Sequence, residues 1–283
     1  MRIEDCFSRG KTPVSFEIFP PKKEQELSGL DGALRRMAAL SPAFVSVTCG
    51  AGGTGAVGKT AEIAETLQKK HGLAAMAHMT CAAARRDDIH KTLEDCRDRG
   101  IENILALRGD LPPGAPSRRL DFTYAADLMR EIGRFGGFCV GGACYPEGHI
   151  DCERADDEIR HMKIKEEAGA VFFVSQLFFE NGLFLRFWEK ARAGGVTKPI
   201  TAGVMPILSR GQIERMIFMC GASLPSRVIK LLRRYENDPG GLRRAGIEMA
   251  AQQAAALIRE GVDGVHIYTM NKADIAEGCY PHG

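Results

Sequence analysis

Polar and ionisable side chains recur at the ends of short apolar segments in this sequence. Glu17 interrupts the segment VSFEIF at residues 14–19, which is followed by two prolines. A carboxyl group held in partly apolar surroundings has a raised pKa and can act as a general acid near neutral pH. Glu17 is therefore a candidate for proton transfer, and a glutamate paired with a buried arginine or lysine would fit the same pattern.

The triplet Arg108, Gly109 and Asp110 closes another apolar segment, NILALRGD. Glycine lets a ligand approach the backbone closely, and the charges on either side can meet the ligand's polar edges. The same triplet is common in surface loops. Its position directly after an apolar segment favours the ligand-binding interpretation.

Further hydrogen-bonding side chains follow other apolar segments. They are His78, Tyr145 and His149. Because the sequence has no HxH or HExxH spacing, these residues favour contacts with a large planar ligand, and no metal site is expected. Gln176 places an amide inside the apolar run FFVSQLFF, where it needs either a hydrogen bond in the core or a ligand.

A glycine-rich stretch, VTCGAGGTG, occupies residues 47–55. It lacks the spacing of a Walker loop and is not the GxGxxG turn of a Rossmann unit. A surface loop would have the same composition, so this stretch alone does not identify a nucleotide site.

Short apolar segments rich in β-branched and aromatic residues alternate with stretches of helical period that close on glycine. The predicted strands are residues 14–19, 43–49, 73–81, 103–109, 138–146, 170–178, 199–207 and 264–271. Eight such units in 283 residues predict an α/β fold, a (β/α)8 TIM barrel, in preference to a doubly wound sheet. We expect one domain over residues 1–283, with an extra helical segment (209–220, 226–235 and 241–260) before the last strand.

A TIM barrel explains why the reactive residues lie at the ends of the predicted strands, because its βα loops gather there. Residue alternation places Val14, Phe16 and Ile18 toward the helices. It places Ser15 and Glu17 toward the barrel interior.

The charge balance limits the classes of partner. The chain has 38 basic and 36 acidic residues without a polybasic stretch, which argues against nucleic acid and anionic membranes. It has no secretory signal and no apolar run of about 18 residues, so we expect a soluble, cytoplasmic protein. Nine cysteines without a CxxC pair favour a reducing compartment over a disulfide framework.

Seven segments together resemble the methylenetetrahydrofolate reductase family, in this order between about residue 12 and about residue 275: VSFEIFPPK, FVSVTCGAGG, AHMTC, NILALRGDLP, CYPEGH, SQLFF and HIYTMN. The resemblance implies a TIM barrel that binds FAD and reduces 5,10-methylenetetrahydrofolate to 5-methyltetrahydrofolate. It implies NADH or NADPH as the electron donor in a ping-pong cycle, serving methionine biosynthesis or other one-carbon metabolism. Family members are commonly homo-oligomers, and some receive electrons from a partner subunit.

The resemblance also implies roles for individual residues. Glu17 would protonate N10 of the folate, and Asp110 would bind the pterin and stabilise its cationic form. Substrate contacts fall on Gln176, Gln212 and Lys272, and nicotinamide contacts fall on Thr48 and Gln176. The FAD contacts fall on Thr48, Cys49, Ala51, His78, Arg108, Gly109, Asp110, Tyr124, Ala125, Tyr145, His149, Glu158, His161 and Lys165.

Two positions depart from the family pattern. Met216 stands where a lid helix often offers an aromatic ring, and Ile164 stands where some relatives have a basic phosphate contact. Two alternative functions remain open: a pterin-binding methyltransferase without redox chemistry, and a flavin subunit that depends on a partner protein for its electrons.

Overall fold

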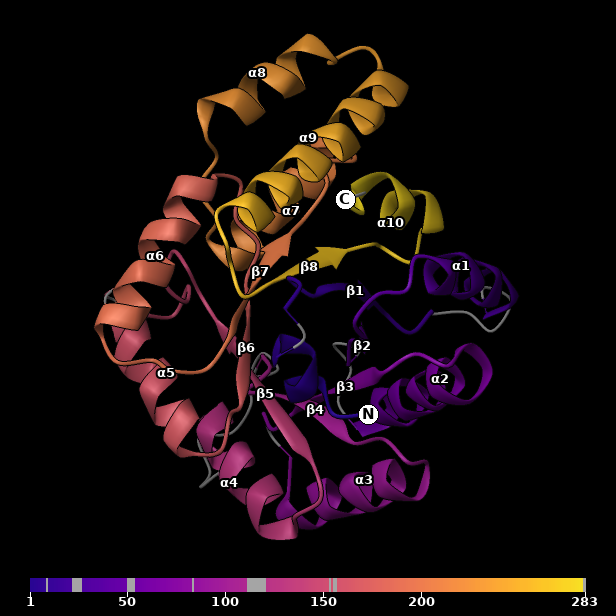
Figure 1. The fold of residues 1–283 in the computed structure, drawn as a ribbon, viewed down its shortest axis with the longest axis vertical. Coiled ribbons are helices and arrows are strands. Elements are labelled where there is room, and N and C mark those ends of the chain that lie inside the picture. The colour runs from indigo at the N-terminus through magenta and orange to yellow at the C-terminus, as the bar shows by residue number, and fades with distance from the viewer. Residues whose placement is uncertain are drawn as a thin grey trace.

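The parallel strands close into a barrel with helices on its outside, as the computed structural model shows (Figure 1). The structure describes residues 1–8, 10–21, 27–49, 54–82, 84–110, 121–152, 154 and 157–281. The strands, which pair in chain order, are β1 (Val14–Ile18), β2 (Val45–Val47), β3 (Ala75–Thr80), β4 (Asn103–Leu107), β5 (Cys139–Cys144), β6 (Phe172–Ser175), β7 (Ile200–Val204) and β8 (Gly264–Tyr268). This topology confirms the predicted (β/α)8 barrel.

Helices follow the strands and cover the outer face of the barrel. They are the α-helices α1 (Leu27–Ala39), α2 (Thr54–His71), α3 (Arg86–Asp98), α4 (Ala125–Phe135), α5 (Asp157–Glu167), α6 (Asn181–Ala193), α7 (Arg210–Cys220), α8 (Ser226–Arg234), α9 (Pro239–Arg259) and α10 (Ala273–Cys279). The 3-10 helix η1 (Ile3–Ser8) precedes β1. Helices α7, α8 and α9 lie between β7 and β8, which confirms the extra helical segment. Within the described ranges, no helix has the length and apolar character needed to cross a bilayer.

The alternation predicted for the first strand is present. Val14, Phe16 and Ile18 belong to the main hydrophobic core that also includes residues of the surrounding helices. On the other face, inside the barrel, the Ser15 hydroxyl contacts His266 of the neighbouring strand β8. Parallel pairing of β1 with both β2 and β8 therefore places Glu17 in the interior as well.

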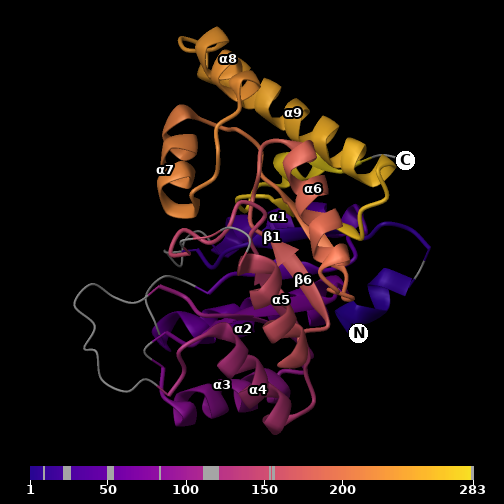
Figure 2. The same ribbon diagram turned by 90° about the vertical axis from the view of Figure 1, so that its left-hand side faces the viewer.

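The helix η1 closes the N-terminal end of the barrel. The Ile3 backbone N–H donates to Oδ1 of Asn103, the first residue of β4, at 2.8 Å. The Phe7 ring lies 5.7 Å from the ring of Phe172 at the start of β6. Figure 2 shows η1 on the side of the barrel opposite α7. Ligands therefore have access to the barrel interior from the C-terminal ends of the strands.

Asp263, just before β8, ties α6 to the barrel. Its Oδ2 atom accepts hydrogen bonds from Trp188 Nε1 at 3.0 Å, from Arg192 Nη2 at 2.5 Å and from the backbone N–H of Ile200 at 2.8 Å. Asp263→Ala leaves these donors without their acceptor, so we expect the free energy of unfolding to fall by about 3 kcal/mol in urea denaturation.

Asp274→Ala is the matched control for that prediction. The Asp274 carboxylate pairs with Arg243 Nη2 at 2.7 Å on the surface, with more than half of its side chain exposed. Exposed ion pairs contribute little, so the control should lose less than about 1 kcal/mol. Equal losses in the two variants would contradict the role assigned to Asp263.

Candidate active site

Glu17 lies at the C-terminal end of β1 between two histidines. Its Oε2 atom is 3.7 Å from Nε2 of His78 on β3 and 3.7 Å from Nε2 of His266 on β8. The Glu17 backbone carbonyl accepts hydrogen bonds from the N–H and the hydroxyl of Thr269, at 3.2 and 2.7 Å. The side chain is 21% exposed. The carboxyl group is thus held at a fixed height in the barrel and remains within reach of a ligand.

His78 presents an unpaired nitrogen to the same space. Its side chain is buried, and within the described part of the chain its Nε2 atom has no hydrogen-bond partner. Burial lowers the pKa of His78 to about 4, while the Glu17 carboxylate opposes this shift. The ring is therefore neutral near pH 7, and its buried Nε2 atom is left without a partner among the described residues.

The lowered pKa of His78 makes stability depend on pH. The folded protein binds this proton less readily than the unfolded chain, so stability is lost as pH falls from about 6.5 toward about 4. The loss from His78 should reach up to about 3 kcal/mol. His78→Gln, which does not titrate, should flatten the difference between urea denaturation curves at pH 7 and pH 4.5, and an unchanged difference would contradict the assignment.

A cavity of about 580 Å³ opens beside the ends of β4 and β5 and is flanked by α4 and α5. It brings together many of the residues that the sequence predicts for FAD. These are Arg108, Tyr124, Ala125, Tyr145, His149, Glu158, His161 and Lys165. Their convergence from separate segments makes this cavity the candidate cofactor site.

Aromatic and cationic groups lie side by side in this cavity. The rings of Tyr145 and His149 meet edge to face with their centroids 4.6 Å apart. The Lys165 ammonium lies 5.5 Å from the centre of the Tyr145 ring and donates a hydrogen bond to the Ala143 carbonyl at 2.8 Å. Burial raises the pKa of Tyr145, so its phenol stays protonated. The wall can therefore offer both ring contacts and a positive charge.

Cationic and acidic side chains share the cavity wall, and the cations are paired with neighbouring carboxylates. The cationic lining residues Arg108, Arg130, Arg160 and Lys165 outnumber the acidic ones, Asp127, Asp151 and Glu158. Arg108 Nη2 donates to Asp151 Oδ2 at 2.5 Å, which raises the pKa of the guanidinium. Glu158 is buried, and burial raises the pKa of its carboxyl group even though Lys165 Nζ lies 3.4 Å away.

Two further histidines border the cavity. Burial, together with the charge of Arg108, lowers the pKa of His149. Burial also lowers the pKa of His161, whose Nε2 atom lies 3.3 Å from Arg160 Nη2. Both rings are therefore neutral hydrogen-bonding groups near pH 7.

Gly109 links this cavity to Asp110. Its φ is +78°, and a Cβ atom at this position would lie 2.9 Å from Cβ of Thr80. Glycine is therefore required for the backbone turn after β4.

Asp110 is exposed. The pKa of the Cys220 thiol at the end of α7 is raised mainly by burial and further by the charge of Asp110. Asp110 consequently lies between the cavity and α7 at the barrel mouth.

Three residues predicted to contact the substrate lie outside the cavity. Gln212 is buried, with its Oε1 atom accepting from the Leu208 N–H at 2.8 Å and its Nε2 atom donating to the Pro206 carbonyl at 3.2 Å. Gln176 follows β6 and accepts from the Leu177 N–H at 2.9 Å. Lys272 is exposed just before α10.

Three predicted site residues follow β2, and two of them, Thr48 and Cys49, belong to the described part of the chain. Thr48 and Cys49 are half-buried. The Thr48 carbonyl accepts a hydrogen bond from the Thr60 hydroxyl at 2.9 Å. Burial raises the pKa of the Cys49 thiol, so it is not an activated nucleophile. Ala51 lies outside the described residues.

The two departures from the family pattern have different positions. Ile164 lines the cavity beside Lys165, where it adds apolar surface. Met216 on α7 is half-buried and packs against a separate hydrophobic cluster that includes Leu177 and Phe179.

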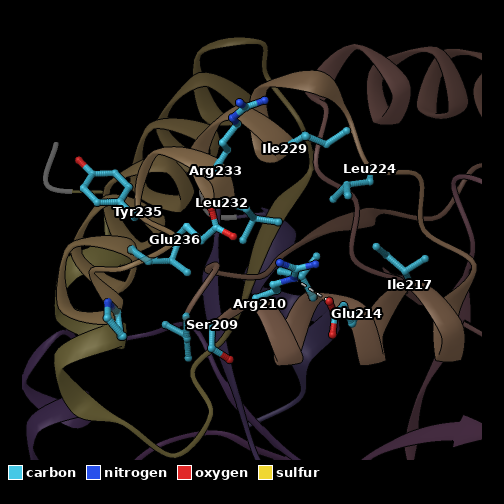
Figure 3. A pocket seen from close by; sticks show the side chains of 14 residues that line it. Ser209, Arg210, Glu214, Ile217, Leu224, Ile229, Leu232, Arg233, Tyr235 and Glu236 are labelled. Atoms are coloured by element: carbon cyan, nitrogen blue, oxygen red, sulfur yellow. Dashed lines mark hydrogen bonds and ion pairs between the residues drawn. The ribbon is translucent and has the colours of Figure 1, made fainter.

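A second cavity, of about 700 Å³, lies between α7, α8 and the start of α9 (Figure 3). Its lining is largely apolar, with Ile217, Leu224 and Ile229 among the residues involved. At its edge Arg210 Nε donates to Glu214 Oε1 at 2.8 Å. The sequence-predicted site residues are not part of this lining.

The sequence predicts that Ser15 faces the barrel interior, but His266 and Ser46 are not among the predicted site residues. The His266 side chain is fully buried, with Ser15 Oγ 2.7 Å from Nδ1 and Ser46 Oγ 3.2 Å from Nε2. The alternation in HIY, applied as it was to VSFEIF, places His266 and Tyr268 toward the interior. Strand alternation was therefore a signal that could have identified them.

Comparison with known proteins agrees with the resemblance. The family model described as methylenetetrahydrofolate reductase matches residues 2–280. A 5,10-methylenetetrahydrofolate reductase from Pectobacterium carotovorum subsp. carotovorum is 34% identical over 95% of this chain and 89% of its own length. A protein from Zea mays named methylenetetrahydrofolate reductase (NADH) 1 is 33% identical over 98% of this chain and 49% of its own length.

A solved structure shares the fold at low sequence identity. It is an uncharacterised protein from Clostridium thermocellum that binds two copies of 5-methyl-5,6,7,8-tetrahydrofolic acid. Its TM-score is 0.62 at 12% identity, with 98% of each chain covered. The match of the family model over residues 2–280, together with relatives above 30% identity, shows that this chain belongs to the methylenetetrahydrofolate reductase family.

Proposed function

We propose that this protein is an FAD-dependent reductase that converts 5,10-methylenetetrahydrofolate to 5-methyltetrahydrofolate. The observation that carries the proposal is the placement of Glu17 at the same barrel mouth as the cavity beside β4 and β5. Glu17 can supply a proton, and the cavity can hold a planar, anionic cofactor. Family membership connects the two to a single reaction.

The residues of the cavity fit FAD. Arg108 and Lys165 would meet the pyrophosphate, and Tyr145 and His149 would contact ring surfaces. Ile164 makes no phosphate contact, so Lys165 would provide the positive charge on that part of α5. When bound, FAD accepts a hydride from NADH or NADPH and delivers it to the folate.

Glu17 would open the folate ring. The methylene group bridges N5 and N10, and it accepts a hydride only after the bond to N10 has broken to leave an iminium ion at N5. Protonation makes N10 a leaving group, and a carboxylic acid in the barrel interior can supply that proton. The hydrogen bonds from Thr269 fix the Glu17 backbone, so the side chain meets the substrate at a defined height.

Asp110 would bind the pterin. Its exposed carboxylate at the barrel mouth can accept hydrogen bonds from the pterin amino edge and stabilise the cationic iminium ion. Gln176 would add an amide contact, and Lys272 would pair with the glutamyl carboxylate of the folate. Gln212 would act by holding the loop between β7 and α7, since its amide group bonds to that loop.

The electron donor and the folate would use one cleft in turn, a ping-pong cycle in which Thr48 and Gln176 contact the nicotinamide. The name of the Zea mays relative specifies NADH for that protein. A partner protein that supplies electrons is the alternative donor.

A pair of anaerobic half-reactions tests this proposal. Protein reconstituted with FAD should lose its flavin absorbance on mixing with NADH or NADPH and regain it on mixing with 5,10-methylenetetrahydrofolate. Bleaching that requires a partner protein would instead indicate a flavin subunit. A colourless protein that cannot be reconstituted with FAD would favour a methyltransferase without redox chemistry.

A further inference from the structure

The ring of His266 is fixed on every side in the barrel interior. It is fully buried and stacks on Phe44 with the ring centroids 5.7 Å apart. Ser15 Oγ lies 2.7 Å from Nδ1, and Ser46 Oγ lies 3.2 Å from Nε2. The Glu17 carboxyl group approaches Nε2 to 3.7 Å. The two ring nitrogens therefore have different partners.

The contacts of Ser15 determine where the imidazole proton lies. Its hydroxyl has one hydrogen, and the Val265 carbonyl, 3.2 Å away, can only accept. If the hydroxyl donates to Val265, its oxygen is left to accept from Nδ1–H of His266. This is the arrangement that satisfies both contacts, and it leaves Nε2 as an acceptor facing Ser46 and Glu17.

An acceptor at Nε2 favours one protonation state of Glu17. A carboxylate would face a lone pair at 3.7 Å, whereas a carboxylic acid could donate its hydrogen to that lone pair once the side chains close to hydrogen-bond distance. We propose that Ser15 and His266 are positioning residues that keep Glu17 in its acid form until the folate arrives. This inference rests on the proposed function, because it explains how the proton donor of that reaction stays protonated.

Other groups that face Glu17 are accounted for in the described residues. From β3, His78 is neutral near pH 7, since burial lowers its pKa to about 4. From β8, burial and the charge of Glu17 raise the pKa of Tyr268, so the phenol stays protonated. From β2, the residue in register with Glu17 is Ser46, which does not titrate. Among the groups that face Glu17, His266 is therefore the one whose tautomer the Ser15 contact determines.

The tautomer of His266 can be measured directly by ¹⁵N-detected correlation NMR of the imidazole rings, with His266→Gln used to assign the signal. We expect a proton on Nδ1 and a bare Nε2 in the parent protein, and the same pattern in Ser15→Thr, which keeps the hydroxyl. Ser15→Ala should move the proton to Nε2. A proton on Nε2 in the parent, or a doubly protonated ring at neutral pH, would overturn the inference.

The pH dependence of folate reduction gives a second readout, for which Ser46→Ala is the matched control. In Ser15→Ala, an Nε2–H would stabilise the carboxylate, so the high-pH limb of the profile, where rate is lost as Glu17 loses its proton, should move to lower pH by about one unit. Above the midpoint this is about a tenfold loss of rate. Ser46→Ala removes a hydroxyl that competes with the Glu17 acid as a donor to Nε2 of His266. The high-pH limb of the Ser46→Ala profile should therefore move to higher pH. Movement of the Ser15→Ala limb to higher pH would instead indicate a His266 imidazolium paired with the Glu17 carboxylate.

The two experiments separate this inference from the proposed function. If parent protein carrying reduced FAD does not react with 5,10-methylenetetrahydrofolate, the proposed function fails. The NMR measurement still decides the tautomer, because it needs neither cofactor nor substrate. If the parent reacts and both serine variants keep its pH profile, the inference fails while the function stands. Equal FAD content and melting temperature in all variants serve as the folding control.

Discussion

Glu17→Gln should leave flavin reduction by NADH or NADPH within about twofold of the parent rate and slow folate reduction at least about 100-fold. Glutamine has the shape of the glutamic acid side chain but cannot transfer a proton to N10. The contacts that place residue 17, above all the hydrogen bonds of Thr269 to its backbone carbonyl, do not involve the side chain. Rapid mixing of each half-reaction separates the two effects.

Glu147→Gln is the matched control for that substitution. Glu147 lies in the loop after β5, where its carboxylate accepts from the Ser223 N–H at 3.1 and 3.0 Å. The control makes the same change from carboxyl to amide near the barrel mouth without removing the proposed acid, so both half-reactions should keep their rates within about twofold. If Glu17→Gln slowed the two half-reactions equally, Glu17 would belong to cofactor binding and not to proton transfer.

Asp110→Asn should slow folate reduction by about tenfold to a hundredfold while FAD remains bound. The substitution removes a negative charge that would stabilise the cationic iminium ion, and it exchanges one acceptor oxygen for a donor. Asp110 is exposed at the mouth, next to the cavity wall, so the loss should fall on the substrate step. The checks are the rate of the folate half-reaction and the FAD content of the purified variant.

Asp151→Asn should have the opposite pattern to Asp110→Asn, with its main effect on FAD binding. Its carboxylate is paired with Arg108 on the cavity wall, so its loss should change the affinity for FAD more than the rate of folate reduction. Complete loss of flavin from Asp110→Asn would show that the main role of Asp110 is cofactor binding.

The barrel was predictable because its signals are local. Each strand is a short apolar run, each helix has its own period, and the alternation in VSFEIF is enough to place Glu17 in the interior. The order of strands follows from repeated βα units. The extra helices before β8 were visible as an interval about twice as long as the others.

The partners of Glu17 were harder to predict, because they depend on register between distant strands. Ser15 and His266 are 251 positions apart, and their contact exists since β1 pairs with β8 to close the barrel. Sequence alternation can orient each side chain, but it does not give the register between strands, which decides which interior side chains are neighbours.

Gln212 illustrates a different limit. Its residue type and its place in SRGQIERM fit a ligand contact, yet its amide groups bond to Leu208 and Pro206 in the adjoining loop. A polar side chain near a site can either meet the ligand or hold a loop, and the sequence pattern is the same for both.

The most direct test of the account is one anaerobic experiment on the parent protein. FAD-loaded protein is reduced chemically, freed of the reductant and mixed with 5,10-methylenetetrahydrofolate, while flavin absorbance and folate products are followed together. The account predicts that the flavin returns to its oxidised spectrum and that one 5-methyltetrahydrofolate forms per flavin. A flavin that stays reduced, or that reoxidises without forming 5-methyltetrahydrofolate, would contradict it.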